Sequence, residues 1–109
     1  MGWEKYIVLE NKKYEQVIDS LYKAFQKFDN QYTLIKDHTG FSLCGNNTKW
    51  PEIMEISVEV ASQEDNAVPN GEKYIYCLFH ICENEAYLFL QTIKSTIDNL
   101  DINYVIDDL

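Results

Sequence analysis

The side chains best suited to chemistry in this sequence are its cysteines and histidines, and three of them lie close together as Cys77, His80 and Cys82. Thiolates and imidazoles are the usual ligands of zinc. The segment has the pattern of a strand, however, and strand side chains alternate between two faces. Cys77 and Cys82 then point to opposite faces, which leaves only His80 and Cys82 together. A third ligand would have to come from another strand, such as Cys44, so we expect no metal site and no cofactor, and we interpret the cysteines as buried structural residues.

Nucleophilic and acid–base catalysis find little support in the sequence. A Cys–His pair needs a third residue that orients the base, and none can be recognised. The segment Asp37-His38-Thr39-Gly40 differs from the Asp-Thr-Gly of aspartic proteases by the inserted His38, it occurs once, and we interpret it as a turn. A nuclease built on His38 and His80 would need a cation for the phosphate, and lysines are scarce around His80. The four glycines are scattered, which argues against a phosphate loop. The sequence therefore predicts a protein that is not an enzyme.

The elements that position these residues follow from the spacing of apolar side chains and from turn residues. We expect Asn11 and Asn84 to cap two helices, and Gly40 to take a positive φ in a hairpin turn. In chain order the predicted elements are a strand over 3–9, a helix to about residue 28, strands over 32–36, 41–44, 54–60 and 74–82, a helix to about residue 100 and a strand over 103–106. This order, β-α-β-β-β-β-α-β, predicts a single α+β domain over residues 1–109, with an antiparallel sheet of five to six strands and two helices packed on one face.

The two faces of the predicted sheet differ in character. One is apolar and we expect the helices to cover it; it carries Met54, Ile56, Val58, Ile75, Phe79 and Ile81. On the other, aromatic side chains stand among carboxylates, and interfaces favour Tyr and Trp as anchors. The predicted partner-binding residues on and around this face are Trp50, Glu55, Glu59, Glu64, Asp65, Glu72, Tyr74, Tyr76 and His80. The alternative is that a loop or terminal segment covers this face and the tyrosines pack as ordinary interior residues.

Charge narrows the choice of partner. The 109 residues include 18 Asp and Glu, nine Lys and no Arg, which gives a net charge of −9. Residues 1–49 hold seven lysines and six acids, whereas residues 50–109 hold two lysines and twelve acids. Such a surface repels phosphate backbones and anionic membranes, so we exclude nucleic acid and membranes as direct partners. Acidity can also serve solubility alone. With no signal-peptide or membrane-span pattern and an odd number of cysteines, we expect a cytoplasmic protein with free thiols.

The acidic strand Trp50–Val60, the segment Glu72–Tyr76 and the lack of Arg make the chain resemble the small immunity proteins of bacterial contact-dependent and other polymorphic toxin systems. The likeness is one of general character over the whole chain and matches no diagnostic motif. It implies a non-enzymatic inhibitor that binds and neutralises the toxin domain of its own system, often a basic nuclease. Carboxylates would then occupy the places of substrate phosphates, with Tyr74, Tyr76 and Trp50 as anchors.

Two other classes share the size and charge of this chain. One is a small acidic secretion chaperone, which would form a homodimer with apolar grooves. The other is a phage-encoded inhibitor of a nucleic-acid-binding protein, which would present a similar acidic surface. A neighbouring gene ending in a basic toxin domain would favour the immunity class.

Overall fold

Strands and helices follow one another along the chain in the predicted order, which confirms the α+β class. The structure, a computed structural model, describes residues 3–45, 52–62, 68–81 and 83–109. The elements in this part of the chain are β1 (Trp3–Leu9), α1 (Tyr14–Phe25), the 3₁₀ turn η1 (Gln26–Phe28), β2 (Tyr32–Lys36), β3 (Gly40–Gly45), β4 (Glu52–Val60), β5 (Lys73–Phe79), α2 (Glu83–Asn99) and β6 (Tyr104–Asp108).

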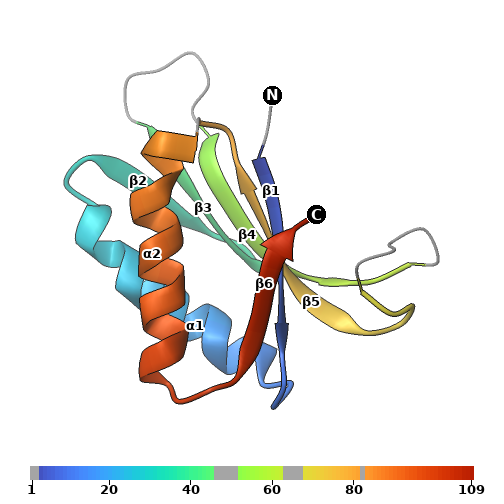
Figure 1. Ribbon diagram of the computed structural model, residues 1–109. Helices are drawn as coiled ribbons and strands as arrows, with labels where there is room; N and C mark the ends of the chain where they lie inside the picture. Colours follow the sequence, from blue (N-terminus) through green and yellow to red (C-terminus); the bar gives the residue numbers. More distant parts are fainter. Residues whose placement is uncertain (1–2, 46–51, 63–67, 82) are drawn as a thin grey trace.

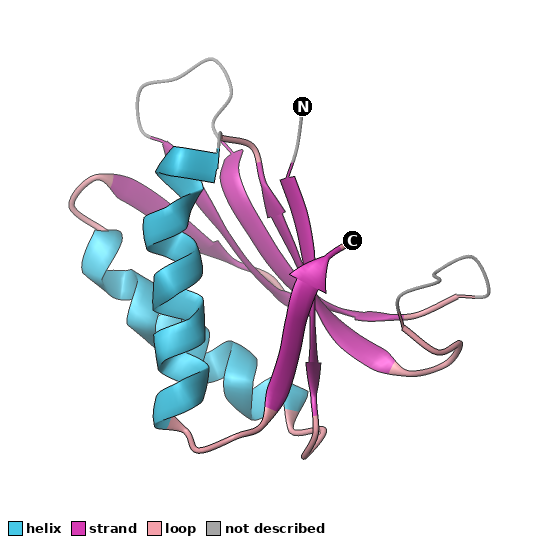
Figure 2. Cartoon of the chain, in the orientation of Figure 1, coloured by secondary structure: helices cyan, strands magenta, loops and turns pink. Residues whose placement is uncertain are grey.

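All six strands form one sheet in the order β2-β3-β4-β5-β1-β6, and every neighbouring pair is antiparallel. The first strand of the chain therefore lies inside the sheet, between β5 and β6. Both helices lie on the same face, and the far end of the β4–β5 hairpin extends away from them (Figures 1 and 2). The sheet thus has one face under the helices and one face without them.

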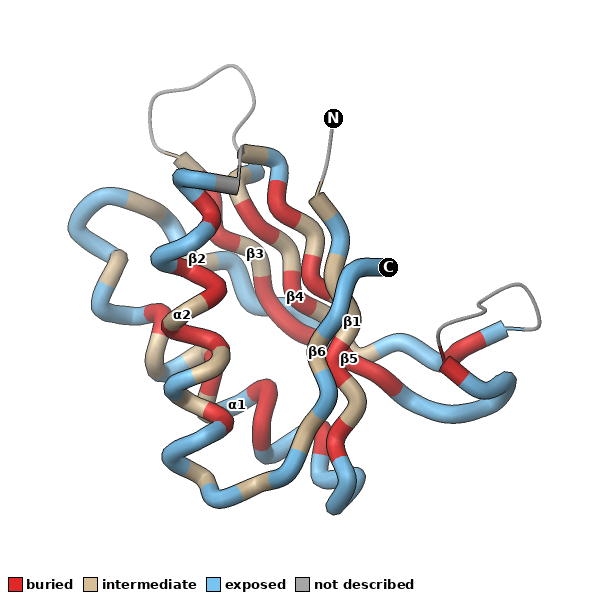
Figure 3. The backbone as a smooth tube through the Cα atoms, in the orientation of Figure 1, coloured by how far each residue is buried: buried red, intermediate tan, exposed pale blue. Residues whose placement is uncertain are grey.

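The core lies between the helices and the sheet, where buried positions recur along both helices and the four inner strands β3, β4, β5 and β1 (Figure 3). The predicted alternation is confirmed for β4 and β5, since Met54, Ile56, Ile75 and Phe79 are at most 1% exposed. Phe25 of α1 is fully buried, and its ring packs against three other aromatic rings. The other fully buried helix residues are Val17, Leu21, Ala86, Ile93 and Ile97. Burial of this apolar area is the main driving force for the two-layer arrangement.

Both predicted helix caps are wrong. Helix α1 begins at Tyr14, and its N-cap residue is Lys13, which offers no side-chain cap. The Asn11 side chain instead accepts a hydrogen bond from the Lys13 N–H at 3.1 Å, within a turn in which Lys12 has φ +59°. Asn11 therefore shapes the turn between β1 and the helix. Helix α2 begins at Glu83, so Asn84 lies in its first turn.

The turn between β2 and β3 is the predicted hairpin turn, organised by Asp37. One oxygen of its carboxylate accepts hydrogen bonds from the N–H groups of Thr39 and Gly40, both at 2.8 Å. The expectation of a positive φ at Gly40 is wrong; among the described glycines only Gly71, at +85°, has one. Gly40 is needed because a Cβ there would lie 1.9 Å from the carbonyl oxygen of Ile56 on β4. Glycine thus permits β3 and β4 to approach each other closely.

A tyrosine hydroxyl joins β1 to β5 at the point where their pairing ends. The last paired residues are Ile7 and Ile75, and the same register would place Leu9 opposite Lys73. There the buried Tyr14 hydroxyl accepts a hydrogen bond from the Leu9 N–H at 3.1 Å and donates one to the Lys73 carbonyl at 2.8 Å. The first residue of α1 is therefore fixed to two strands of the sheet.

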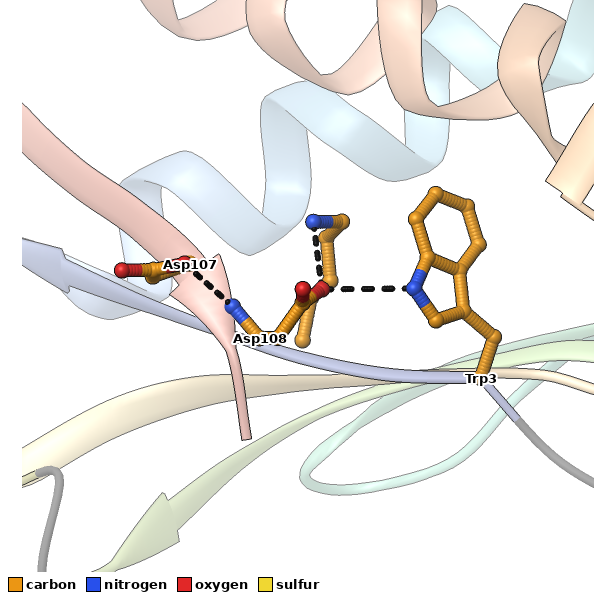
Figure 4. A network of polar contacts seen from close by, with 4 residues as sticks. Trp3, Asp107 and Asp108 are labelled. Atoms are coloured by element: carbon orange, nitrogen blue, oxygen red, sulfur yellow. Dashed lines mark hydrogen bonds and ion pairs between the residues drawn. The ribbon is translucent and has the colours of Figure 1, made fainter.

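The two terminal strands are also joined by a polar network on the helix side of the sheet (Figure 4). The Asp108 carboxylate accepts hydrogen bonds from Lys5 Nζ at 2.7 Å and from the indole N–H of Trp3 at 3.2 Å. The hydrogen bond from Lys5 lowers the pKa of Asp108 below its ordinary value. Because the Lys5 side chain is only 13% exposed, Asp108 supplies the counter-charge for a largely buried cation.

Candidate partner-binding face and its carboxylate–histidine cluster

The face of the sheet that no helix covers, called the open face below, is built by residues paired across neighbouring strands. One row crosses four strands, with Glu55 between Ser42 and Leu78, and Leu78 in turn opposite Glu4. A second row runs from Ser57 through Tyr76 and Tyr6 to Asp107. Directly paired residues of antiparallel strands share a face. Acids therefore flank a central strip made of Tyr6, Tyr76 and Leu78.

The lysines and most acids of the described strands lie on opposite faces of the sheet; the exception is Asp108 of β6, which binds Lys5 on the helix side. The strand lysines lie on the helix side: Lys5 binds Asp108, Lys36 lies over the Tyr22 ring of α1, and Lys73 lines a depression beside Tyr14. No lysine of the described strands lies on the open face. The carboxylates of that face, by register and by contact, are Glu4, Glu52, Glu55, Glu59 and Asp107. The strand carboxylates are therefore concentrated on one face of the sheet.

Tyr76, a predicted site residue, lies in the middle of the open face. Its side chain is half-buried and forms a hydrogen bond with the Glu4 carboxylate. Burial, that hydrogen bond and the negative charges of Glu4 and Glu55 raise the pKa of Tyr76 to about 12. The hydroxyl therefore stays protonated, and this tyrosine can act as a hydrogen-bond donor and an apolar anchor. A depression of about 280 Å³ lies beside it, lined by Glu55, Glu59, Ser42 and Leu78 among others.

Tyr74 does not lie in the exposed part of this face, contrary to the expectation. It is 6% exposed and packs with Ala61 and Val68, two residues of the segment that joins β4 to β5. Tyr6, Val8 and Tyr76 border this small second cluster. At this end of the face, residues of the segment between β4 and β5 therefore cover Tyr74, as in the alternative arrangement considered from the sequence. The acid Glu59 lies opposite Tyr74 and remains exposed.

His80 lies in a cluster with two glutamates that the strand pattern would separate. Its Nε2 atom is 2.7 Å from Glu55 Oε2 and 4.0 Å from Glu52 Oε2. Three residues apart on a regular strand, Glu52 and Glu55 would point to opposite faces. A bulge changes this: Leu43 is opposite Met54, but Cys44 is opposite Glu52. The extra residue, Ile53, packs with the core, and both glutamates lie beside His80.

The thiols that the structure describes, Cys44 and Cys77, are buried and free. Burial raises the pKa of Cys77 to about 12. Burial and the charges of Glu52 and Glu55 raise the pKa of Cys44 as well, which places Cys44 beside the carboxylate–histidine cluster. Both thiols therefore stay protonated, the state of structural rather than nucleophilic cysteines.

The structure brings together only part of the predicted site. Glu55, Glu59, Tyr76 and His80 share the open face, whereas Trp50, Glu64 and Asp65 lie outside the described residues. Glu72 is exposed and forms an ion pair at 3.6 Å with Lys12, in the turn before α1, and so lies apart from the cluster. Sequence reasoning missed three acids of the face, which are Glu4, Glu52 and Asp107. The alternation of β1 could have placed Glu4, but nothing in the sequence announces the bulge that places Glu52.

Neither the family models, nor the curated proteins, nor the solved structures compared with this chain gave a match. Among the described residues no helix is long and apolar enough to cross a membrane. A functional proposal therefore has to be argued from the geometry and charge of the open face.

Proposed function

We propose that this chain is a non-enzymatic immunity protein, which binds and neutralises a basic toxin domain through its open face. The observation that carries the proposal is the segregation of charge across the sheet. Five carboxylates lie on the open face, and the described strand lysines lie on the helix side of the sheet. A surface used only for solubility has no need for such a division, since interspersed charges serve that purpose equally well.

The open face also has the parts that give an interface affinity. Tyr76, Tyr6 and Leu78 supply aromatic and apolar area at its centre, and acids surround them. Central anchors with a charged rim are typical of protein interfaces. The field of the acids would steer a basic partner, and close charge pairs couple by about 1.5–7 kcal/mol. A basic nuclease domain bound here would have its phosphate-binding surface blocked by carboxylates.

The test is a double charge reversal on the open face, Glu55→Lys with Glu59→Lys. We expect it to weaken binding to the basic toxin domain of the same system by about 100-fold or more, since two close charge pairs become repulsive. The affinity that remains should depend less on salt, because fewer attractive pairs are left to screen. Binding is measured by surface plasmon resonance at several salt concentrations, and protection by growth of cells that express the toxin.

A matched control separates the face from the overall charge. Glu10→Lys with Asp29→Lys changes two exposed acids away from the open face and takes the net charge from −9 to −5, as the test variant does. The control should retain protection and most of the affinity. Equal loss of affinity in both double variants would mean that bulk charge, and not the open face, attracts the partner. Unchanged binding in the test variant would remove the open face as the interface.

A second candidate, a dimeric binding module of the secretion-chaperone kind, draws on another part of the surface. A mostly apolar depression of about 340 Å³ lies between η1 and α2, lined by Phe28, Tyr32, Ile53, Leu88 and Phe89. Leu88 is 57% exposed at its rim. Sedimentation equilibrium distinguishes the two: a stable homodimer that Leu88→Asp dissociates would favour the chaperone class. A monomer that binds the toxin domain favours the immunity class.

A further inference from the structure

We propose that Glu52, Glu55 and His80 form a binding site for a divalent transition-metal ion, with zinc as the reference ion. The donor atoms of these three side chains all lie within 4.8 Å of one another. They come from two neighbouring strands, with Glu52 and Glu55 on β4 and His80 at the end of β5.

The distances fit a tetrahedral ion after small side-chain movements. With metal–ligand bonds of about 2.0–2.2 Å, neighbouring ligand atoms of a tetrahedral zinc site lie about 3.3 Å apart. His80 Nε2 and Glu55 Oε2 would separate from 2.7 Å, and Glu52 Oε2 would approach His80 Nε2 from 4.0 Å. These two changes are under 1 Å, and the two carboxylate oxygens, which lie within 4.8 Å of each other, would approach by at most about 1.5 Å, within the reach of rotations about glutamate χ angles. The backbone that sets these positions is fixed by the bulge and by the hydrogen bond at 2.8 Å from the His80 N–H to the Ile53 carbonyl.

The charge of the cluster favours a cation. Two carboxylates converge on one imidazole nitrogen, and in the described part of the chain their only ion-pair partner is His80. A neutral imidazole can donate the proton on Nε2 to one of the two carboxylates only. The two carboxylates repel each other, and because the Glu55 and His80 side chains are only 37% and 35% exposed, water screens this repulsion incompletely. A divalent ion would neutralise both carboxylates at once.

The type of donor selects the class of ion. Imidazole and carboxylate together suit zinc, nickel and copper, whereas magnesium and calcium take oxygen ligands. Three protein ligands leave a fourth position for water or for a side chain of another molecule. Cys44 is 8% exposed and lies opposite Glu52, so a softer donor is adjacent to the site. The sequence predicts no metal here, because regular alternation would put Glu52 on the other face.

The experiment titrates the tag-free protein with Zn²⁺ at neutral pH and follows binding by calorimetry and by NMR of the two histidine rings. We expect one Zn²⁺ per chain, a shift of the His80 ring signals, and no shift of His38, which lies in the exposed β2–β3 turn. Glu52→Gln, Glu55→Gln and His80→Gln should each weaken binding by about 10-fold or more. The matched control Glu59→Gln, an acid of the same strand outside the cluster, should change the affinity by less than about 2-fold.

Three results would overturn the inference. The first is the absence of saturable binding of one ion per chain. The second is binding that His80→Gln and both glutamine variants leave unchanged. The third is equal competition by Mg²⁺, because a diffuse acidic surface attracts any divalent cation. The variants Glu52→Gln and Glu55→Gln alter exposed or half-exposed side chains, so they test the site even if His80→Gln folds poorly. Circular dichroism verifies the fold of each variant.

Discussion

The hydroxyl of Tyr14 offers a sharp test of how the helix layer is fixed to the sheet. In Tyr14→Phe the ring stays in place, but the Leu9 N–H and the Lys73 carbonyl lose their shared partner. A net hydrogen bond contributes about 0.5–1.5 kcal/mol, and a buried polar group left unsatisfied costs about 1–3 kcal/mol. Tyr14 is 4% exposed, so water cannot easily replace the hydroxyl. We expect the free energy of unfolding to fall by about 2 kcal/mol, which lowers the Tm by roughly 8–12 °C in a domain of this size.

The assay is urea unfolding followed by circular dichroism, with Tyr22→Phe as the matched control. Tyr22 also lies on α1 and packs against an aromatic ring, that of Phe41, and the structure gives its hydroxyl no hydrogen bond among the described residues. The control should therefore stay within about 0.5 kcal/mol of the parent protein. A loss below about 0.5 kcal/mol in Tyr14→Phe would refute the reasoning, since it would show that β1 and β5 close up and form the direct Leu9–Lys73 bond.

Two further changes probe the β2–β3 turn. Gly40→Ala should cost about 3 kcal/mol or more, because its Cβ would overlap the Ile56 carbonyl, whereas Gly71→Ala should cost about 1–2 kcal/mol from its positive φ alone; urea unfolding compares them. The Asp37 carboxylate accepts hydrogen bonds, of which the one from the Thr39 backbone has the largest effect, and they lower the pKa of Asp37 below its ordinary value of 3.8. The ionised carboxylate therefore stabilises the fold above pH 3.8. This stabilisation is lost as the pH falls through the lower pKa of the folded state. Asp37→Asn should therefore be less stable than the parent at neutral pH, and the difference should vanish in acid unfolding curves; a constant difference would contradict the assignment.

Local features of the fold could be read from the sequence, because they depend on neighbouring residues. The alternation over Met54, Ile56 and Val58 predicted β4, and the apolar spacing predicted both helices. The caps failed at Asn11 and Asn84, since an asparagine side chain satisfies a turn as readily as a helix N-terminus. Whether the asparagine side chain stabilises a turn or caps a helix depends on the direction in which the backbone leaves the preceding strand.

The candidate site was harder to predict because it depends on pairing between distant strands. The bulge beside Met54 and the cover that Val68 places over Tyr74 are both set by tertiary contacts. Alternation alone therefore put Tyr74 in the open and separated Glu52 from Glu55. The division of charge was visible along the sequence only as an acidic second half. The register of the strands turned it into a division between the two faces of the sheet.

The interior position of β1 has a consequence for the time course of folding. Its neighbours are β5, residues 73–79, and β6, residues 104–108, so this strand has no partner until β5 is synthesised. During that interval β2, β3 and β4 can already pair as a meander under α1. Contacts of long sequence separation slow folding. We expect the nascent chain to be most vulnerable to aggregation before β5 is synthesised, while the apolar strand β1 has no partner.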